Sequence, residues 1–200
     1  MNMVGDAPLM NGFEDRVLDA TACFGAVLDA MSRPARVLRL PVIPETPAGL
    51  LAGSVTVLLT LADMDTPVWL APECDTPEAR AHLRFHAGCP VVEKPSDAAF
   101  AVMSVTCDLS AIDAMPVGTA EYPDRSATVI LQSDGLIASI GPIFSGPGIE
   151  NQHQFDVIHA SQMLWPQVAA NADLFPRGLD WIFTSPSQLA AVPRTTKVEF

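Results

Sequence analysis

The stretch LLAGSVTVLLTLA, residues 50–62, is the longest apolar run of the chain and decides its fold class. A membrane-spanning helix needs about 20 apolar residues, so this shorter run predicts a buried core helix. Thr46 and Pro47 supply a cap and a first helical turn, and the helix is expected to run to about Ala62. Because it is apolar on almost every side, it must lie between other layers of structure.

An amphipathic helix is predicted before the apolar run. Asn11 and Glu14 have the spacing of a capping box, and Pro34 is expected to end the helix. Residues 35–42 then have the composition of a first strand. The apolar residues of the helix share one face, which is expected to pack on the core: Phe13, Val17, Phe24, Val27, Leu28 and Met31.

Strands dominate the second half of the chain. Thr76-Pro77-Glu78 opens one more helix, ending at Gly88; Asp134-Gly135 predicts a hairpin turn, and a helix within 154–172 is expected to break at Pro166. The segments predicted to be strands are 66–72, 98–104, 126–132, 136–144, 178–185 and 188–199, the last at an edge because of Pro193. The pattern predicts one α/β domain over residues 1–200, with a mixed β-sheet covered by helices on both faces.

Composition excludes two kinds of partner. The chain has 11 basic and 23 acidic residues, a net charge of −12, so it lacks the basic surface that nucleic acid or an anionic membrane requires. The four cysteines form no C-x-x-C pair and are expected to be reduced, mostly buried thiols of a cytoplasmic protein. The opening residues, MNMVGDAPLMNG, do not have the pattern of a signal peptide.

Familiar catalytic motifs do not occur in the sequence. It has no G-x-S-x-G, H-E-x-x-H, Walker or G-x-G-x-x-G pattern. The glycine-rich loop 141–150 is either a rigid turn between a strand and a helix or a ligand-facing loop. Pro142 and Pro147 remove two of the backbone donors that an anion nest would use. The three tryptophans are expected in the core or at an interface: Trp69, Trp165 and Trp181.

Two pairs of side chains have metal-ligand spacing. His82 and His86 lie one helical turn apart, but no third ligand is apparent, and a half-exposed helix face is the alternative. Asp63 and Asp65 suit a divalent cation, or an ordinary turn between helix and strand. We therefore expect no metal site.

Covalent chemistry with pyridoxal phosphate would need a lysine in a setting that lowers its pKa. The chain has two lysines, Lys94 in a loop and Lys197 near the end, and neither lies in an apolar stretch. We expect no cofactor.

Several segments, in order, resemble the PhnH family of the bacterial carbon–phosphorus lyase system. They are SVTVLLTLADMDTPVWL (54–70), LRFHAGCPVV (83–92), DAAFAV (97–102), GTAEYPDRSATVILQ (118–132), GPGI (146–149), FPRGLD (175–180) and VPRTTKVE (192–199). MSRPARV, residues 31–37, fits the M-x-x-P-G pattern of that family, with Ala35 where glycine is usual. The match covers nearly the whole chain.

The resemblance implies a fold and a role. PhnH proteins resemble the large domain of fold-type-I pyridoxal-phosphate transferases without the cofactor lysine. They form homodimers and join PhnG, PhnI and PhnJ in a core complex. With PhnL, the PhnG, PhnH and PhnI subunits support formation of alpha-D-ribose 1-alkylphosphonate 5-triphosphate from ATP and an alkylphosphonate.

This chain would then be an accessory subunit of that synthase, a transferase, and not catalytic alone. Two other hypotheses remain. One is a small-molecule binding subunit or enzyme with a phosphate or nucleotide pocket at the dimer interface, and the other is an unrelated pyridoxal-phosphate enzyme.

The segment PRTTK, residues 193–197, raises the question of a phosphate site. Its guanidinium, hydroxyl and ammonium groups suit a phosphate-bearing ligand, and they equally suit the outer face of a strand. Arg194 and Thr195 are expected at a subunit contact or a vestigial anion pocket, beside Asp63 and Thr66. The remaining ligand or interface candidates are Arg84, His86 and Asp180.

Overall fold

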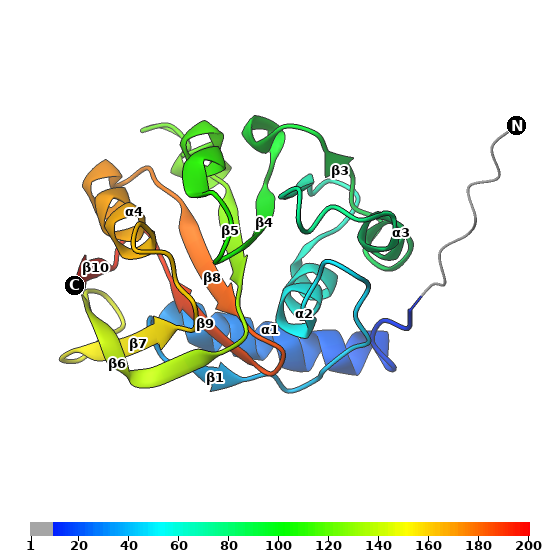
Figure 1. Ribbon diagram of the computed structural model, residues 1–200, viewed down its shortest axis with the longest axis horizontal. Coiled ribbons are helices and arrows are strands. Elements are labelled where there is room, and N and C mark those ends of the chain that lie inside the picture. The colour runs from blue at the N-terminus through cyan, green and yellow to red at the C-terminus, as the bar shows by residue number, and fades with distance from the viewer. Residues whose placement is uncertain (1–9) are drawn as a thin grey trace, which may run out of the picture.

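The computed structural model describes residues 10–200 and contains a large mixed β-sheet (Figure 1). The seven strands of this sheet lie in the order β1-β9-β8-β5-β4-β2-β3. Strands β3, β2, β4, β5 and β8 run parallel to one another. β9 pairs with β8 in antiparallel fashion, and β1 pairs with β9 in antiparallel fashion. Their bounds are β1 Leu38–Arg39, β2 Val68–Leu70, β3 Val91–Val92, β4 Phe100–Ser104, β5 Thr128–Gln132, β8 Asp180–Thr184 and β9 Gln188–Val192.

A smaller antiparallel sheet has the order β10-β6-β7. Its strands are β6 (Leu136–Ser145), β7 (His153–Val157) and β10 (Lys197–Glu199). The predicted hairpin at Asp134-Gly135 is therefore wrong, because β5 and β6 belong to different sheets. The predicted strand 188–199 is divided in the same way: Pro193 follows the end of β9, and β10 pairs with β6.

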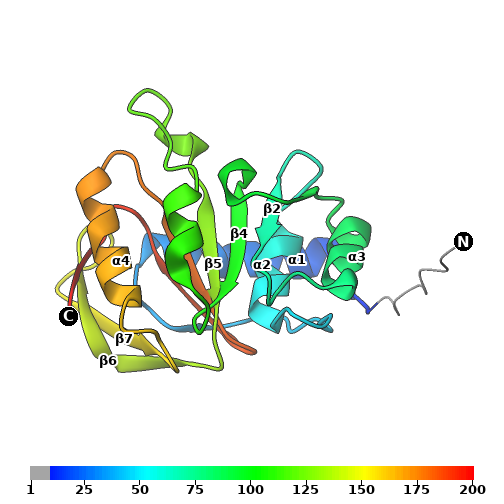
Figure 2. The ribbon, with the colours of Figure 1, turned by 45° about the horizontal axis from the view of Figure 1, so that its top comes forward.

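Helices cover both faces of the main sheet, which confirms the predicted architecture (Figures 1 and 2). One face is covered by α1 (Arg16–Ser32), α2 (Ala52–Leu61) and α3 (Pro77–His86). The other is covered by α4 (Leu164–Asn171), the 3₁₀ helix Leu109–Ala114 and the small sheet. Three shorter 3₁₀ turns span Pro95–Asp97, Pro123–Arg125 and Ala172–Leu174.

The core consists of two layers because successive strand residues point to opposite faces. In β2, Val68 and Leu70 pack against α1, α2 and α3, while Trp69 between them faces the opposite layer. Phe144 and Phe155 of the small sheet stack in that second layer with ring centroids 4.9 Å apart. Trp69, Trp165 and Trp181 are all buried in it, as predicted.

The start of α1 differs from the prediction. Asp15, not Asn11, is the N-cap, and its carboxylate accepts from the backbone N–H groups of Val17 and Leu18 at 3.0 Å. The Asn11 N–H instead donates to Glu45. The end is as predicted, at Ser32, two residues before Pro34.

The predicted core face of α1 is also wrong in part. Cys23, Val27 and Ala30 are buried, but Val17, Phe24 and Leu28 are exposed.

Helix α2 begins at Ala52, five residues after the predicted start at Pro47, and ends at Leu61. Gly53 lies at its beginning because a Cβ there would come within 2.6 Å of the Ser185 carbonyl oxygen. The close approach packs the first turn of α2 onto the end of β8.

The segment 153–172 contains a strand as well as a helix. His153–Val157 form β7, and α4 starts only at Leu164. Pro166 therefore lies in the first turn of α4, where its missing N–H costs no helical hydrogen bond, and it does not break the helix. Half of the predicted glycine-rich loop is strand, because residues 141–145 belong to β6. Residues 146–152 join β6 to β7, two strands, and not a strand to a helix.

Ala35 adopts a positive φ of 64° in the turn between α1 and β1. Glycine is the residue that tolerates this conformation without cost, which accounts for the glycine usual at this place in the PhnH pattern. No helix within residues 10–200 combines the length and apolar character needed to cross a membrane.

Candidate functional site

Arg194 and Asp180, two separate candidates in the sequence, form an ion pair. Residues 181 and 192 are paired across β8 and β9, and this register brings Arg194 beside Asp180. Asp180 Oδ1 accepts from the backbone N–H of Arg194 at 2.9 Å and from its Nε at 3.2 Å. The side chains are only 15 % and 17 % exposed.

The remaining donors of Arg194 also point to its own chain. Nη1 donates to the carbonyl oxygen of Pro123 and Nη2 to the hydroxyl of Ser126, both at 2.6 Å. Each nitrogen of the guanidinium is thus engaged. Arg194 ties the segment after β9 to β8 and to the 3₁₀ turn Pro123–Arg125, and it is not an open anion-binding group.

Thr195 lines a hollow next to this ion pair. The hollow has a volume of about 290 Å³ and includes Phe175, Arg194, Thr195 and Lys197 among its lining residues. Lys197 is exposed in β10, so its ammonium group is available to a ligand. This is the part of the PRTTK segment that keeps a cation at the surface.

Asp63 and Thr66 lie in the turn between α2 and β2, apart from Arg194. The carboxylate of Asp63 accepts from the Thr66 hydroxyl at 2.6 Å and from the Asp65 N–H at 3.0 Å. These two hydrogen bonds lower the pKa of Asp63. Two strands, β5 and β4, separate β8 from β2 in the sheet, so the structure does not bring the two groups together.

His86 and Arg84 lie in the last turn of α3. The Nε2 of His86 donates to the carbonyl oxygen of Met10 at 2.9 Å, and its backbone carbonyl accepts from Arg16. His86 therefore connects α3 to the segment before α1. Arg84 is exposed, at the end of a helix where a positive charge is favourable.

His82 differs from the half-exposed residue that the spacing predicted. It is only 1 % exposed, and neither of its ring nitrogens has a hydrogen-bond partner among residues 10–200. Its ring centroid is 4.5 Å from that of His86. Burial, and secondarily the neighbouring His86, lower the pKa of His82 to about 4. His82 is therefore neutral at physiological pH.

A buried polar network at the carboxyl ends of β5 and β8 was not predicted. Gln132 accepts from the Leu51 N–H at 2.9 Å and from the Ser54 hydroxyl at 3.0 Å, and it donates to the Gly49 carbonyl at 2.8 Å. Ser54 also hydrogen-bonds to Thr184. The signal in the sequence was that polar residues end two otherwise apolar strands, TVILQ and DWIFT.

This network occupies the place where many α/β proteins bind a ligand. The carboxyl ends of parallel strands and the N-terminus of a following helix form a favourable site for phosphate. Leu51, the N-cap of α2, has no capping side chain, and the Gln132 amide takes that role from another element. Two backbone N–H groups of this terminus are thus satisfied from within the chain, that of Leu51 by Gln132 and that of Gly53 by the Ser185 carbonyl oxygen at 3.2 Å.

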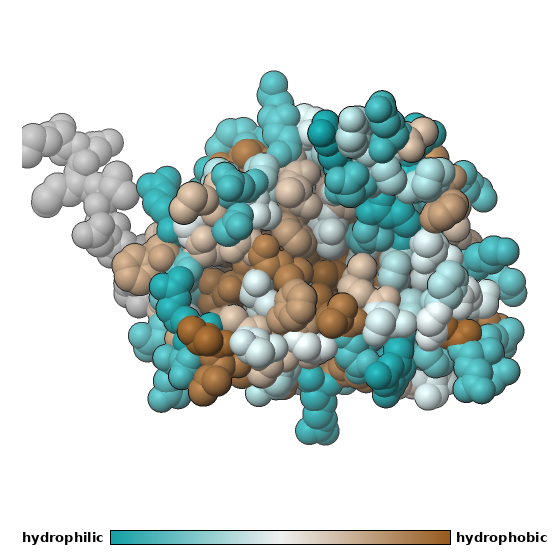
Figure 3. Space-filling view, turned by 180° about the vertical axis from the view of Figure 1, so that it is seen from behind, coloured by the Kyte–Doolittle hydropathy of each residue, from teal (hydrophilic) through white to brown (hydrophobic). Residues whose placement is uncertain are grey.

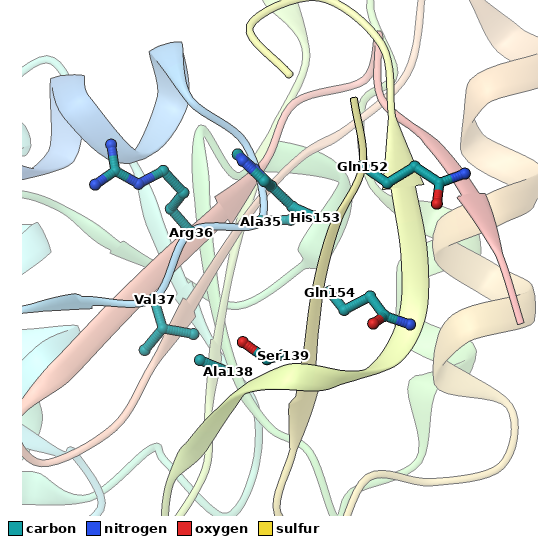
Figure 4. Close-up of a pocket in the computed structure, with 8 residues that line it drawn as sticks. All are labelled: Ala35, Arg36, Val37, Ala138, Ser139, Gln152, His153 and Gln154. Carbon is teal, nitrogen blue, oxygen red and sulfur yellow. The ribbon is translucent and has the colours of Figure 1, made fainter. Parts of the chain in front are cut away.

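A second hollow lies between the α1–β1 turn and the small sheet and has a volume of about 540 Å³ (Figure 4). Arg36 and His153 extend toward one side of it, whereas Gln152 and Gln154 extend away from them. His153 also donates to the carbonyl oxygen of Pro34 at 2.7 Å. The polar side chains do not converge on a common point.

The thiols and the possible metal ligands do not form a reactive centre. Burial raises the pKa of Cys74 and Cys107 to about 12 and that of Cys89 to about 11, so these thiols stay protonated. All four cysteines are free. In residues 10–200 no group of three or more histidine, cysteine, aspartate or glutamate side chains is placed to hold a metal ion.

These features define an α/β protein whose candidate polar residues mostly bond to one another. The family model described as "Bacterial phosphonate metabolism protein (PhnH)" matches residues 11–199. A curated relative from Rhizobium meliloti (strain 1021), named "Alpha-D-ribose 1-methylphosphonate 5-triphosphate synthase subunit PhnH", is 35% identical over 98% of this chain and 99% of its own length. The chain belongs to the PhnH family.

A second relative is more distant. It is the "Putative C-P lyase subunit protein HtxG" of Stutzerimonas stutzeri, 30% identical over 44% of this chain and 45% of its own length. Both relatives carry names that describe subunits.

Proposed function

We propose that this chain is an accessory subunit of the synthase that forms alpha-D-ribose 1-alkylphosphonate 5-triphosphate from ATP and an alkylphosphonate. The observation that carries the proposal is the 35% identity to the subunit from Rhizobium meliloti, which extends over almost the full length of both chains. In this role the chain supplies surfaces to other polypeptides, and the groups that break and form bonds come from those partners.

The state of the polar residues supports a non-catalytic role. A general base, a nucleophile or an anion clamp must present free atoms to a substrate. Arg194 is engaged at each guanidinium nitrogen, Gln132 caps α2, and the thiols are held protonated. Neither lysine is buried, as an activated Schiff-base lysine would be: Lys94 and Lys197 are both exposed.

The proposal includes partners and location. We propose that the chain forms a homodimer, assembles with PhnG, PhnI and PhnJ, and acts in the cytoplasm. We also propose that residues 1–200 are one domain whose fold is related to the large domain of fold-type-I pyridoxal-phosphate transferases. The support for the single domain is that both core layers pack on the same seven-stranded sheet.

Co-expression tests the assembly. The tagged chain is produced together with PhnG, PhnI and PhnJ, and the purified complex is analysed by gel filtration and mass spectrometry. We expect the three partners to co-elute with the chain in constant ratio. Recovery of the tagged chain without them, over a range of salt concentrations, contradicts the proposal.

A second candidate function is binding of a phosphate-bearing small molecule. The observation that favours it is the hollow of about 290 Å³ beside Thr195, where Lys197 keeps an exposed ammonium group. Titration calorimetry of the isolated chain with ATP and with methylphosphonate tests it, with Lys197→Ala as the matched variant. Heat that Lys197→Ala abolishes supports a ligand site, and no heat at millimolar ligand supports the accessory role.

A further inference from the structure

The outward side of α1 is apolar although it faces solvent. Val17 is 74%, Leu18 68%, Phe24 51% and Leu28 57% exposed. At 100° per residue, these four side chains and the small residues between them lie along one side of the helix. We call this surface the α1 outer face; it consists of Val17, Leu18, Thr21, Phe24, Gly25 and Leu28.

The opposite side of the same helix is apolar as well. Cys23, Val27 and Ala30 pack into the core. A surface helix of a soluble protein normally carries charged residues on the side away from the core, and a helix that is apolar all round is normally buried. The observed exposure of α1 therefore indicates a surface that another molecule covers.

A neighbouring side chain enlarges the surface. Phe85, in the last turn of α3, is 66% exposed. Phe85 lies next to the start of α1, because Arg16 donates to the backbone carbonyl of His86. Seen from behind, apolar side chains gather across the middle and the lower part of the molecule (Figure 3). Contiguous exposed apolar patches larger than a few hundred Å² mark interaction sites on soluble proteins.

The charge of the chain bears on which molecule covers the α1 outer face. The chain has a net charge of −12, so two copies repel one another wherever acidic residues meet. On the outward side of α1 the charged residue is Asp29, and its carboxylate is paired with Arg33 at 3.1 Å. The α1 outer face is thus a part of the surface where a second, equally acidic copy can approach without a facing like charge. A basic partner would be expected to use an acidic surface instead.

We propose that the α1 outer face is the interface at which two copies of this chain associate, with their α1 helices antiparallel across a two-fold axis. Placing the axis between residues 22 and 23 sets Val17 opposite Leu28 of the second copy. It also sets Phe24 opposite Thr21, so that each large ring meets a small side chain. The proposal rests on the homodimer proposed above and names its surface.

Details of the helix suit this packing. The Thr21 hydroxyl donates to the Val17 carbonyl of its own helix at 2.7 Å, so Thr21 presents its methyl group to a partner without an unsatisfied donor. A Cβ built on Gly25 has no neighbour within 4 Å, so there is open space above the middle of the helix. Two-fold interfaces use the same patch on both copies, and this patch meets that condition.

The α1 outer face reaches the buried area of a stable interface only when residues beside the helix also take part. A stable interface buries about 800 Å² per partner, and α1 is about 25 Å long at 1.5 Å per residue. Phe85 lies outside the helix, beside its start, and widens the covered surface. We therefore expect a dimer that dissociates on dilution.

Sedimentation of the full chain over a range of concentrations tests the interface. We expect a dimer, and we expect Leu28→Glu to raise its dissociation constant at least tenfold, because the change buries a charge on both copies. Met163→Glu is the matched control: Met163 is 63% exposed at the start of α4, on the other side of the main sheet, and the change should leave the dimer intact. Circular dichroism of both variants checks the fold.

A residue exchange tests the antiparallel arrangement itself. Thr21→Phe places two rings against each other and Phe24→Thr leaves a gap, so each change alone should weaken the dimer at least fivefold. The double variant restores a ring opposite a small side chain and should return the dissociation constant to within about threefold of the starting value.

Two results overturn the interface. A dimer that tolerates Leu28→Glu shows that a different surface is used, while the homodimer itself stands. A monomer at all concentrations removes both the interface and the homodimer, and the subunit role then depends on the co-expression test alone.

Discussion

At the residue scale, His82 is the least compensated side chain of the described residues. It is buried in α3 with both ring nitrogens free of hydrogen bonds. A buried polar group without a partner costs about 1–3 kcal/mol. His82 therefore lowers the free energy of unfolding.

Replacement of His82 by leucine should stabilise the fold. We expect His82→Leu to raise the free energy of unfolding by about 1 kcal/mol, because the unsatisfied nitrogens are removed and the volume is roughly kept. Urea unfolding at pH 8 measures the change, with His153→Leu as a control, since His153 donates a hydrogen bond to Pro34 that the leucine loses. A destabilised His82→Leu would show that His82 has a partner.

The pH dependence of stability follows from the same residue. In the folded chain the pKa of His82 is lowered to about 4, whereas in the unfolded chain it has its ordinary value near 6.5. Between these values the unfolded state binds more protons, so stability falls as the pH is lowered from 6.5 toward 4. The loss should be on the order of 1–3 kcal/mol and should be smaller in His82→Leu. Parallel curves for the two proteins would contradict the assignment.

Arg194 and Asp180 should contribute stability as a pair. Loss of one partner leaves a largely buried charge, so Arg194→Ala and Asp180→Ala should each lower the free energy of unfolding by about 3 kcal/mol. The double variant should cost less than the sum, and the double-mutant cycle measures the coupling. Additive effects would show that the two residues act independently. The sequence identified both residues, but their pairing depends on the β8–β9 register, which a spacing of 14 residues does not reveal.

At the element scale, α2 shows how a distant residue sets the start of a helix. Thr46 and Pro47 have the local signature of a helix start, yet α2 begins at Ala52. Thr76 explains part of the difference, because its hydroxyl donates to the carbonyl of Ala48 and ties the segment before α2 to the start of α3. Gln132 then caps the helix from β5. Local signatures cannot include such contacts.

Removal of the Gln132 amide should weaken this connection. We expect Gln132→Ala to lower the free energy of unfolding by about 2 kcal/mol, since it leaves the Leu51 N–H and the Gly49 carbonyl without their partner. Gln152→Ala, at an exposed position, is the control and should have an effect below about 0.5 kcal/mol. Equal losses of unfolding free energy in the two variants would contradict the assignment of Gln132 as the cap of α2.

The elements that could be predicted are those with strong local patterns. The apolar strands β4, β5 and β8 were predicted because their composition requires burial on both faces. Thr76 and Pro77 predicted the start of α3, and the Thr76 hydroxyl does cap it. The strand β7 was missed because its alternation of polar and apolar residues covers only residues 154–157, which is too short to distinguish a strand from the helix predicted there. The two-sheet arrangement could not be predicted, because the choice of sheet for β6 and β10 is made by tertiary packing.

At the scale of the whole molecule, two features fit a subunit that supplies surfaces to other chains. One is the exposed apolar side of α1, and the other is that the polar groups of the interior mostly bond to one another. The pattern of Val17, Phe24 and Leu28 predicted a core-facing helix side, and the structure exposes it. An apolar pattern indicates that a helix side is buried, but it does not tell whether the same chain or another chain covers it. The prediction that this side faces the core of its own chain was therefore wrong. A subunit can bury such a face against another chain.

The seven segments that resemble PhnH predicted the family correctly, whereas composition and motif spacing alone predicted only a fold class. The seven segments in order were informative because together they span most of the chain, whereas each motif by itself is weak. Spacing alone left the roles of Asp63, Thr66, Arg84, His86 and Thr195 open. The structure shows hydrogen bonds of Asp63, Thr66 and His86 to their own chain, and a role in binding is a proposal for all five.

The most direct test of the account measures turnover with and without the partner subunits. The purified chain is incubated with ATP and methylphosphonate, alone and together with PhnG, PhnI and PhnL, and products are followed by ³¹P NMR and by release of adenine. We predict no adenine release by the chain alone, and formation of the ribose 1-methylphosphonate 5-triphosphate that is lost when the chain is omitted from the full set. Adenine release by the isolated chain, or full activity of the other subunits without it, would contradict the account.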